Sequence, residues 1–128
     1  MSIVYTIDEQ TIRLSDMSGD LLTIREEPGE AGVLVFLAGT LRNDVIFYLQ
    51  DELESLLSLG LSITVDFSEV RYVSAAAQQV FLSAQHRIER TGKGKQRFIH
   101  MPEDVYLAFE RTGASELLNI ERGGNHAL

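Results

Sequence analysis

The stretch Ser62-Ile63-Thr64-Val65-Asp66-Phe67, followed a few residues later by Ser74-Ala75-Ala76-Ala77-Gln78, decides the fold of this chain. The first segment is short and apolar, which is typical of a strand buried in a sheet. After a link through Val70 and Tyr72, we expect a helix to begin near Ser74, with an apolar face repeating every three to four residues. On that helix Gln78 is expected to point away from the core. A buried strand followed directly by an amphipathic helix predicts an α/β fold.

The sequence before this stretch repeats the same order of elements. Residues 21–26 read as a strand, and the continuous apolar run 33–37 reads as a strand buried on both faces and ended by Gly39. A helix is then expected with Asn43 as its N-cap and apolar residues recurring as far as Leu57. Phe47 and Tyr48 lie off the apolar stripe of this helix, so we expect them to be partly exposed.

The sequence after it adds a third strand and a third helix. Residues 97–99 form a short apolar strand, and Pro102 opens a helix that stops at Thr112-Gly113. We therefore predict one α/β domain over residues 21–120, with a mixed β-sheet backed by α-helices. Residues 1–20 are expected to form an N-terminal extension, either a strand, a hairpin or an arm. Residues 121–128 are expected to form a flexible tail.

Composition excludes several classes of protein. The chain has 128 residues, a formal net charge of −8 and no cysteine. Its acidic surface disfavours binding to nucleic acids and to anionic lipid headgroups, and disulfide and thiolate chemistry are absent. The first twenty residues have no apolar core of a signal peptide, and no run is long enough to cross a bilayer. We expect a cytoplasmic protein that does not insert into a membrane.

Four short motifs then occur in a specific order, and together they resemble the STAS domain family, which includes the anti-sigma factor antagonists. They are Gly39-Thr40-Leu41-Arg42, Asp66-Phe67-Ser68-Glu69-Val70, Tyr72-Val73-Ser74-Ala75-Ala76-Ala77, and Glu110-Arg111-Thr112-Gly113. The resemblance covers about residues 21–120 and implies a STAS-like mixed sheet backed by helices. It also implies a protein-binding regulatory function, with an anti-sigma factor or a switch-kinase-like protein as partner.

In this family a serine at the start of the second helix accepts a phosphate, where the positive end of the helix dipole favours an anion. Here Ala75 occupies the acceptor position, Ser74 occupies the preceding acidic position, and Arg42 replaces an acidic residue of the earlier turn. The phosphoswitch is therefore expected to be absent or displaced to Ser74. Because serine is a good N-cap, we favour a capping role for Ser74 and predict that it is not phosphorylated.

The candidate partner-binding residues lie where the carboxyl ends of the parallel strands are expected to meet. They are Thr40, Arg42, Asn43, Asp66, Ser68, Ser74 and Gln78. For Asp66 a second interpretation is equally weighted, in which its carboxylate caps a turn. Self-association into a homodimer is also left open.

Two other functions were weighed against this one. STAS domains that resemble this chain also serve as accessory subunits of lipid-transport ATPase complexes in the membrane. A receiver-like signalling domain has a similar length and layout, but the chain lacks the early acidic pair that a receiver uses to bind Mg²⁺. No cofactor fingerprint, metal-ligand spacing or nucleophile beside a base is found, so we predict a protein that is not an enzyme.

Overall fold

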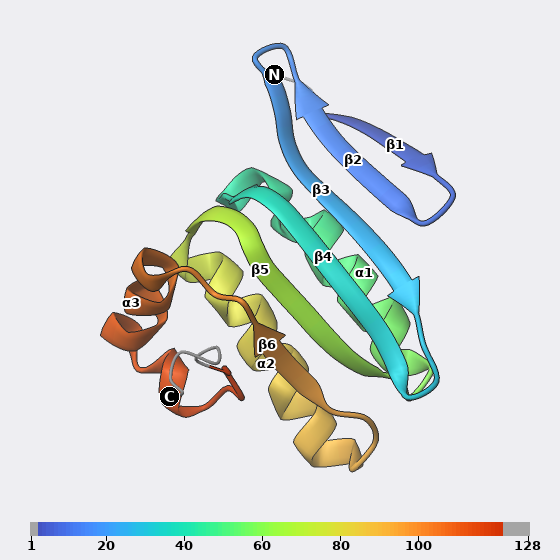
Figure 1. Cartoon of the computed structure of the whole chain (residues 1–128), viewed down its shortest axis with the longest axis vertical. Helices are drawn as coiled ribbons and strands as arrows, with labels where there is room; N and C mark the ends of the chain where they lie inside the picture. The colour runs from blue at the N-terminus through green and yellow to red at the C-terminus, as the bar shows by residue number, and fades with distance from the viewer. Residues whose placement is uncertain (1–2, 122–128) are drawn as a thin grey trace.

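The computed structural model of the protein describes residues 3–121, and within them six strands form one mixed sheet in the order β1-β2-β3-β4-β5-β6 (Figure 1). The first four strands pair antiparallel, and β4, β5 and β6 pair parallel. The strands are β1 (Val4–Asp8), β2 (Thr11–Asp16), β3 (Gly19–Pro28), β4 (Gly32–Leu41), β5 (Ser62–Val73) and β6 (Gln96–Ile99). The predicted mixed α/β fold of one domain is confirmed.

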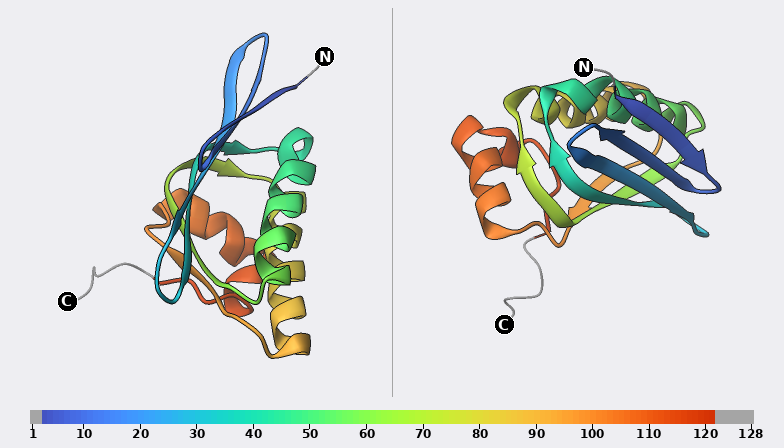
Figure 2. Two further views of the ribbon diagram at one scale, coloured as in Figure 1. Left: turned by 90° about the vertical axis from the view of Figure 1, so that its right-hand side faces the viewer. Right: turned by 90° about the horizontal axis from the view of Figure 1, so that it is seen from above.

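Two helices cover one face of this sheet. Both views of Figure 2 place α1 (Ile46–Ser58) and α2 (Ala75–Thr91) side by side on that face. The third helix, α3 (Glu103–Thr112), lies beyond β5 at the side of the sheet, and the short turn η2 (Ala114–Glu116) follows it. No helix among residues 3–121 has the length and apolar character required to cross a bilayer.

Four phenylalanines join the sheet to α2 and α3. Phe67 of β5 packs against Phe81 of α2, Phe98 of β6 and Phe109 of α3, with ring centroids 5.6, 5.8 and 6.0 Å away. All four side chains are fully buried. Edge-to-face aromatic pairs of this kind add about 1 kcal/mol each beyond the burial of their area. This cluster sets the position of α2, which carries Ser74 at its start.

Strands β1 and β2 form a hairpin, one of the three alternatives considered for this part of the chain. Strands β1 and β2 are joined at Glu9, which adopts a left-handed conformation with φ 53°. Tyr5 of β1 stacks on Tyr48 of α1 at 5.3 Å between ring centroids. Tyr48 is consequently half-buried, whereas Phe47 is exposed, in line with the expectation for both. The predicted C-terminal tail lies outside the described residues except for Glu121.

Three predicted boundaries are wrong. Gly39 does not end its strand but lies within β4, with φ 122°. Glycine is needed there because a β-carbon would meet the Leu21 carbonyl oxygen of β3 at 2.3 Å. The strand predicted to end at Phe67 continues to Val73, so the expected link is part of β5. Asn43 is the first residue of a 3₁₀ turn, η1 (Asn43–Val45), and not the cap of the helix that follows.

Candidate functional site

The carboxyl ends of β4 and β5 meet at one edge of the sheet. In the parallel register Thr40 lies beside Tyr72 and Leu41 beside Val73. One residue further, the Ser74 N–H donates to the Leu41 carbonyl at 2.9 Å. This bond places the start of α2 beside the turn that leads into α1. Open α/β sheets bind ligands and partners at such an edge, because the loops after parallel strands converge there.

Ser74 is the N-cap of α2, as predicted. Its Oγ accepts the N–H of Ala77 at 3.1 Å, and the side chain is only 7% exposed. The cap satisfies one of the N–H groups that a helix leaves without a partner in its first turn. Ala75 and Ala76 follow it and are exposed, so the first turn of α2 presents methyl groups to solvent.

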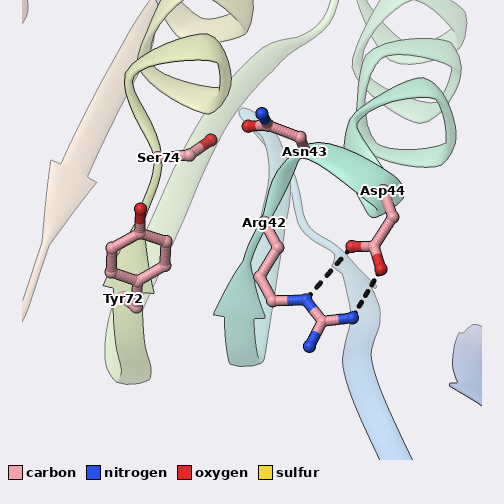
Figure 3. Close-up of a pocket in the computed structure, with 5 residues that line it drawn as sticks. All are labelled: Arg42, Asn43, Asp44, Tyr72 and Ser74. Atoms are coloured by element: carbon pink, nitrogen blue, oxygen red, sulfur yellow. Dashed lines mark hydrogen bonds and ion pairs between the residues drawn. The ribbon is translucent and has the colours of Figure 1, made fainter.

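A shallow hollow of about 400 Å³ lies over this cap. It is lined by Arg42, Asn43, Asp44, Tyr72 and Ser74, and Figure 3 shows the Asn43 and Ser74 side chains pointing toward one another. The Tyr72 side chain is 53% exposed at its margin. We refer to these five residues as the cap hollow. Three of them were predicted from the sequence, and two, Asp44 and Tyr72, were missed. No local pattern marks Tyr72, because burial does not alternate at this end of β5: Arg71 and Tyr72 are both exposed, and Val73 is buried.

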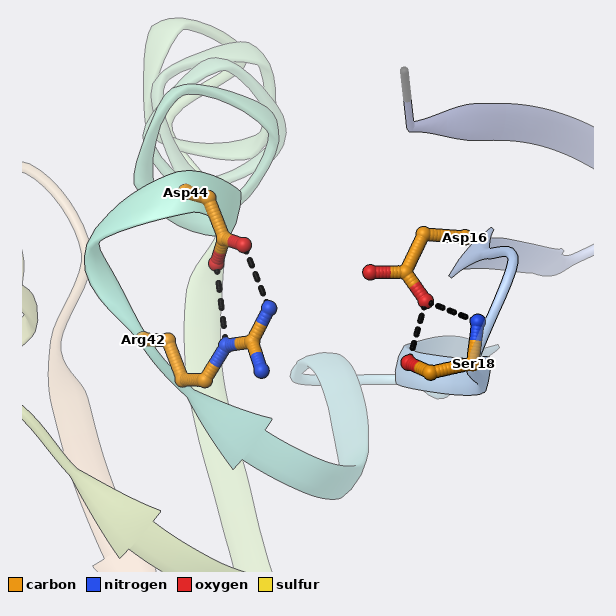
Figure 4. Close-up of polar contacts among 4 residues, drawn as sticks. All are labelled: Asp16, Ser18, Arg42 and Asp44. Carbon is orange, nitrogen blue, oxygen red and sulfur yellow. Dashed lines mark hydrogen bonds and ion pairs between the residues drawn. The ribbon is translucent and has the colours of Figure 1, made fainter. Parts of the chain in front are cut away.

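Arg42 does not reach toward Ser74. Its guanidinium instead forms a two-pronged ion pair with the Asp44 carboxylate, which lowers the pKa of that carboxyl below its ordinary value. Asp16 lies on the other side of Arg42, where Ser18 hydrogen bonds to it and lowers its pKa as well (Figure 4). Arg42, Asp44 and Ser18 are exposed and Asp16 is half-buried, so one guanidinium lies between two carboxylates beside the cap.

Asp66 and Ser68 do not line the cap hollow. The Asp66 carboxylate accepts the Ser68 N–H at 2.8 Å and contacts Nδ1 of His100 at 3.0 Å. Between the paired positions Phe36–Asp66 and Ala38–Glu69, β5 has one residue more than β4 and therefore forms a bulge. The hydrogen bond from Ser68 to the Asp66 carboxylate lies within this bulge and supports it. Burial by itself raises the pKa of Asp66, but hydrogen bonds from Ser68 and His100 outweigh it and hold that pKa below its ordinary value. This geometry is the turn-capping role weighed from the sequence, with His100 as a partner that the sequence did not indicate.

Gln78 lies inside the protein, so the expectation that it points away from the core is wrong. Its side chain is 3% exposed. The Oε1 atom accepts the Thr112 hydroxyl at 2.6 Å, and Nε2 donates to the Ala108 carbonyl at 3.3 Å. Gln78 therefore joins α2 to the end of α3. Its polar side chain is buried because both of its polar atoms find hydrogen-bond partners on α3, a helix distant in the sequence. Such a residue acts on the position of α3 and is not available as a surface contact.

The cap hollow has the chemistry of a contact surface. Within residues 3–121, the Ser74 hydroxyl has neither a histidine nor a carboxylate within hydrogen-bonding distance, so nothing there would activate it as a nucleophile. No group of three potential metal ligands occurs in the same range. The hollow offers an arginine, a carboxylate, an amide and a phenol around a capped helix end, with the exposed methyl groups of Ala75 and Ala76 next to it in the chain.

Comparison with known proteins assigns the family. A family model described as "Mlab, STAS domain" matches residues 24–119, three quarters of the chain. The chain belongs to the STAS domain family. This STAS domain carries β1 and β2 ahead of the matched region, while every residue of the cap hollow lies inside it. No curated protein sequence gives a match.

Solved structures show the same fold at low sequence identity. An anti-sigma factor antagonist from Mycobacterium paratuberculosis superposes with a TM-score of 0.72 at 11% identity, over 89% of this chain and 95% of that one. The unphosphorylated anti-sigma factor antagonist SpoIIAA gives 0.64 at 12% identity, over 81% and 92%. A putative anti-sigma factor antagonist from Thermotoga maritima gives 0.65 at 14% identity, over 81% and 90%. The STAS fold predicted from the four motifs is confirmed.

Proposed function

We propose that this STAS domain is a cytoplasmic protein-binding regulatory module that resembles an anti-sigma factor antagonist and engages its partner through the cap hollow. The observation that supports it is the exposed pair of Arg42 and Tyr72 beside the buried cap of α2. Arginine and tyrosine are enriched among the residues that dominate binding energy at protein interfaces. A shallow, open hollow of this kind suits a protein surface better than a small substrate, which binds in a deeper cleft.

We further propose that the partner contact is not switched by phosphorylation. The residue at the family's acceptor position is Ala75, whose methyl group cannot accept a phosphate. Ser74, one residue earlier, is 93% buried and its oxygen already accepts the Ala77 N–H, so a kinase would have to open the first turn of α2 to reach it. On this basis the domain binds constitutively or responds to a signal other than phosphate. The proposed domain spans residues 21–120, preceded by residues 1–20 as an N-terminal extension.

The partner surface is tested by affinity capture from the native cytoplasm with the wild type and two variants, Arg42→Asp and Tyr72→Ala. We expect both variants to lose an anti-sigma factor or switch-kinase-like partner that the wild type captures. Arg90→Asp is the matched control, because it makes the same change of charge on an exposed residue at the other end of α2. An identical set of partners for the wild type and both variants would place the interface elsewhere.

The same experiment separates the other functions. Capture of ATPase and permease subunits through Arg42 and Tyr72 would make the domain an accessory subunit of a transport complex. A receiver-like function would require acyl-phosphate formation with Mg²⁺ and a small phosphodonor, which we do not expect. To test the switch, the captured kinase is incubated with the domain and ATP, and mass spectrometry is used to look for phosphate. Phosphate on Ser74 would contradict the unswitched mechanism without affecting the binding surface.

A further inference from the structure

The outer edge of β1 is the open edge of the sheet. Among the residues that the structure describes, 3–121, strand β1 pairs with β2 alone, and it is the outermost strand in Figure 1. At the other side of the sheet, β6 is covered at Phe98, whose N–H donates to Asn119 and whose carbonyl accepts the N–H of Glu121, at 2.9 and 2.8 Å. An edge strand leaves alternate N–H and C=O groups of its main chain free to pair with another strand.

This edge lacks the features that usually prevent strands from pairing. All five residues of β1 are exposed, and Val4, Tyr5 and Ile7 are exposed by 55%, 43% and 63%. The strand has no proline, lysine or bulge, and its one charged residue is Asp8 at its end. Natural edge strands are typically blocked by such residues, because an open apolar edge recruits other chains.

The edge is also held in place before any partner arrives. The stacking of Tyr5 on Tyr48 ties β1 to α1, and the five residue pairs with β2 keep the strand extended. A strand that is already ordered loses little conformational freedom on association. The free energy of pairing is therefore not consumed by folding the strand.

We propose that a second copy of this chain pairs with β1, antiparallel and centred on Thr6. In that register Tyr5 of each copy lies opposite Ile7 of the other, and Val4 lies opposite Asp8. Aromatic and β-branched residues in directly opposite positions stabilise antiparallel strands. The two Asp8 carboxylates end at opposite ends of the paired strands, so the contact brings no like charges together.

Charge and symmetry select a second copy over other occupants. A chain with a net charge of −8 repels itself across most of its surface, but the β1 edge is nearly neutral. Because each copy offers one such edge, pairing through a two-fold axis consumes it and stops at a dimer. The contact is a five-residue strand, smaller than the roughly 800 Å² per partner of a standard interface. We therefore expect a dissociation constant of about 10 µM to 1 mM.

Sedimentation velocity of the full chain over this concentration range tests the proposal. The wild type should sediment as a concentration-dependent dimer, and Thr6→Lys and Thr6→Glu should each weaken association by about tenfold or more, because each puts two like charges face to face. An equimolar mixture of the two variants should restore the dimer. Ser55→Lys, an exposed substitution on α1, is the control for added positive charge and should dimerise like the wild type.

Two results would overturn the proposal. One is a wild type that stays monomeric across the range. The other is a dimer that Thr6→Lys and Thr6→Glu leave unchanged, since the contact would then lie elsewhere. Circular dichroism of each variant should match the wild type because Thr6 is exposed, so a loss of association cannot be confused with unfolding. If β1 proves to bind a strand of a different protein while the wild type remains monomeric, the self-pairing is wrong.

Discussion

Replacing Glu26 with glutamine should make this protein more stable at alkaline pH. Glu26 lies on β3 and hydrogen bonds to Glu52 of α1, and its Oε2 atom is buried without a hydrogen-bond partner among the described residues. Burial, and then the hydrogen bond and negative charge of Glu52, raise the pKa of Glu26 from its ordinary value of 4.5 to about 8. At neutral pH the folded protein therefore holds a proton that the unfolded chain has released.

The sign and size of the effect follow from this difference in proton binding. Because the folded pKa is raised, the stability conferred by protonated Glu26 is complete below about pH 4.5 and is lost as the pH rises through about 8. Each pH unit in that window is worth about 1.4 kcal/mol at most. The full window would amount to about 5 kcal/mol, but the carboxyl is only partly buried and solvent screens it. We therefore expect roughly 2 kcal/mol.

The assay is urea unfolding followed by circular dichroism at intervals from pH 5 to pH 9. Glu26→Gln keeps a donor for Glu52 and does not titrate, so its stability relative to the wild type should grow by roughly 2 kcal/mol across the range. Glu52→Gln should reduce the pH dependence only in part, because the burial of Glu26, the larger cause of its raised pKa, remains. Glu30→Gln, in the exposed turn after β3, is the matched control and should not change it. A constant difference between Glu26→Gln and wild type from pH 5 to pH 9 would refute the reasoning.

Substitutions at four further positions test the fold and the site, each by urea unfolding. Ser74→Ala should cost about 1 kcal/mol through loss of the cap, whereas Ser74→Asp should not, and equal losses would contradict the capping role. Gly39→Ala should cost at least about 2 kcal/mol, because its β-carbon would collide with Leu21; a neutral result would show that β3 and β4 can separate. Phe98→Ala should cost about 3–5 kcal/mol, and a loss under 1 kcal/mol would exclude a packed aromatic cluster. Asp66→Asn should cost about 1 kcal/mol near neutral pH and less as the pH falls through the lowered pKa of Asp66; a loss unchanged by pH would rule out the charged contact with His100.

Much of the fold could be predicted because its signals are local. The apolar run around Val35, the periodicity of α2 and the capping serine at position 74 each depend on residues within one or two turns of the chain. A helix cap is read from neighbouring residues because its hydrogen bonds close over three or four positions, and a buried strand is read from its own run of apolar residues. The four ordered motifs then placed these elements in the STAS family.

Three of the missed features depend on contacts between distant residues. Gln78 is polar by sequence, and only contacts with α3, including Thr112 34 residues later, make its burial favourable. Gly39 reads as the end of a strand until β3 approaches it at Leu21, and the sequence does not indicate that His100, just after β6, contacts Asp66.

The candidate site likewise has features that the sequence predicts locally and features that depend on the folded structure. The sequence alone determined that Ser74 caps a helix and that Ala75 cannot carry a phosphate, because both properties belong to the residues themselves. Only the tertiary structure decided that Tyr72 borders the cap hollow and that β1 is left as an open edge. Those features arise when strands and loops far apart in the chain converge, and the folded sheet alone brings them within reach of one another.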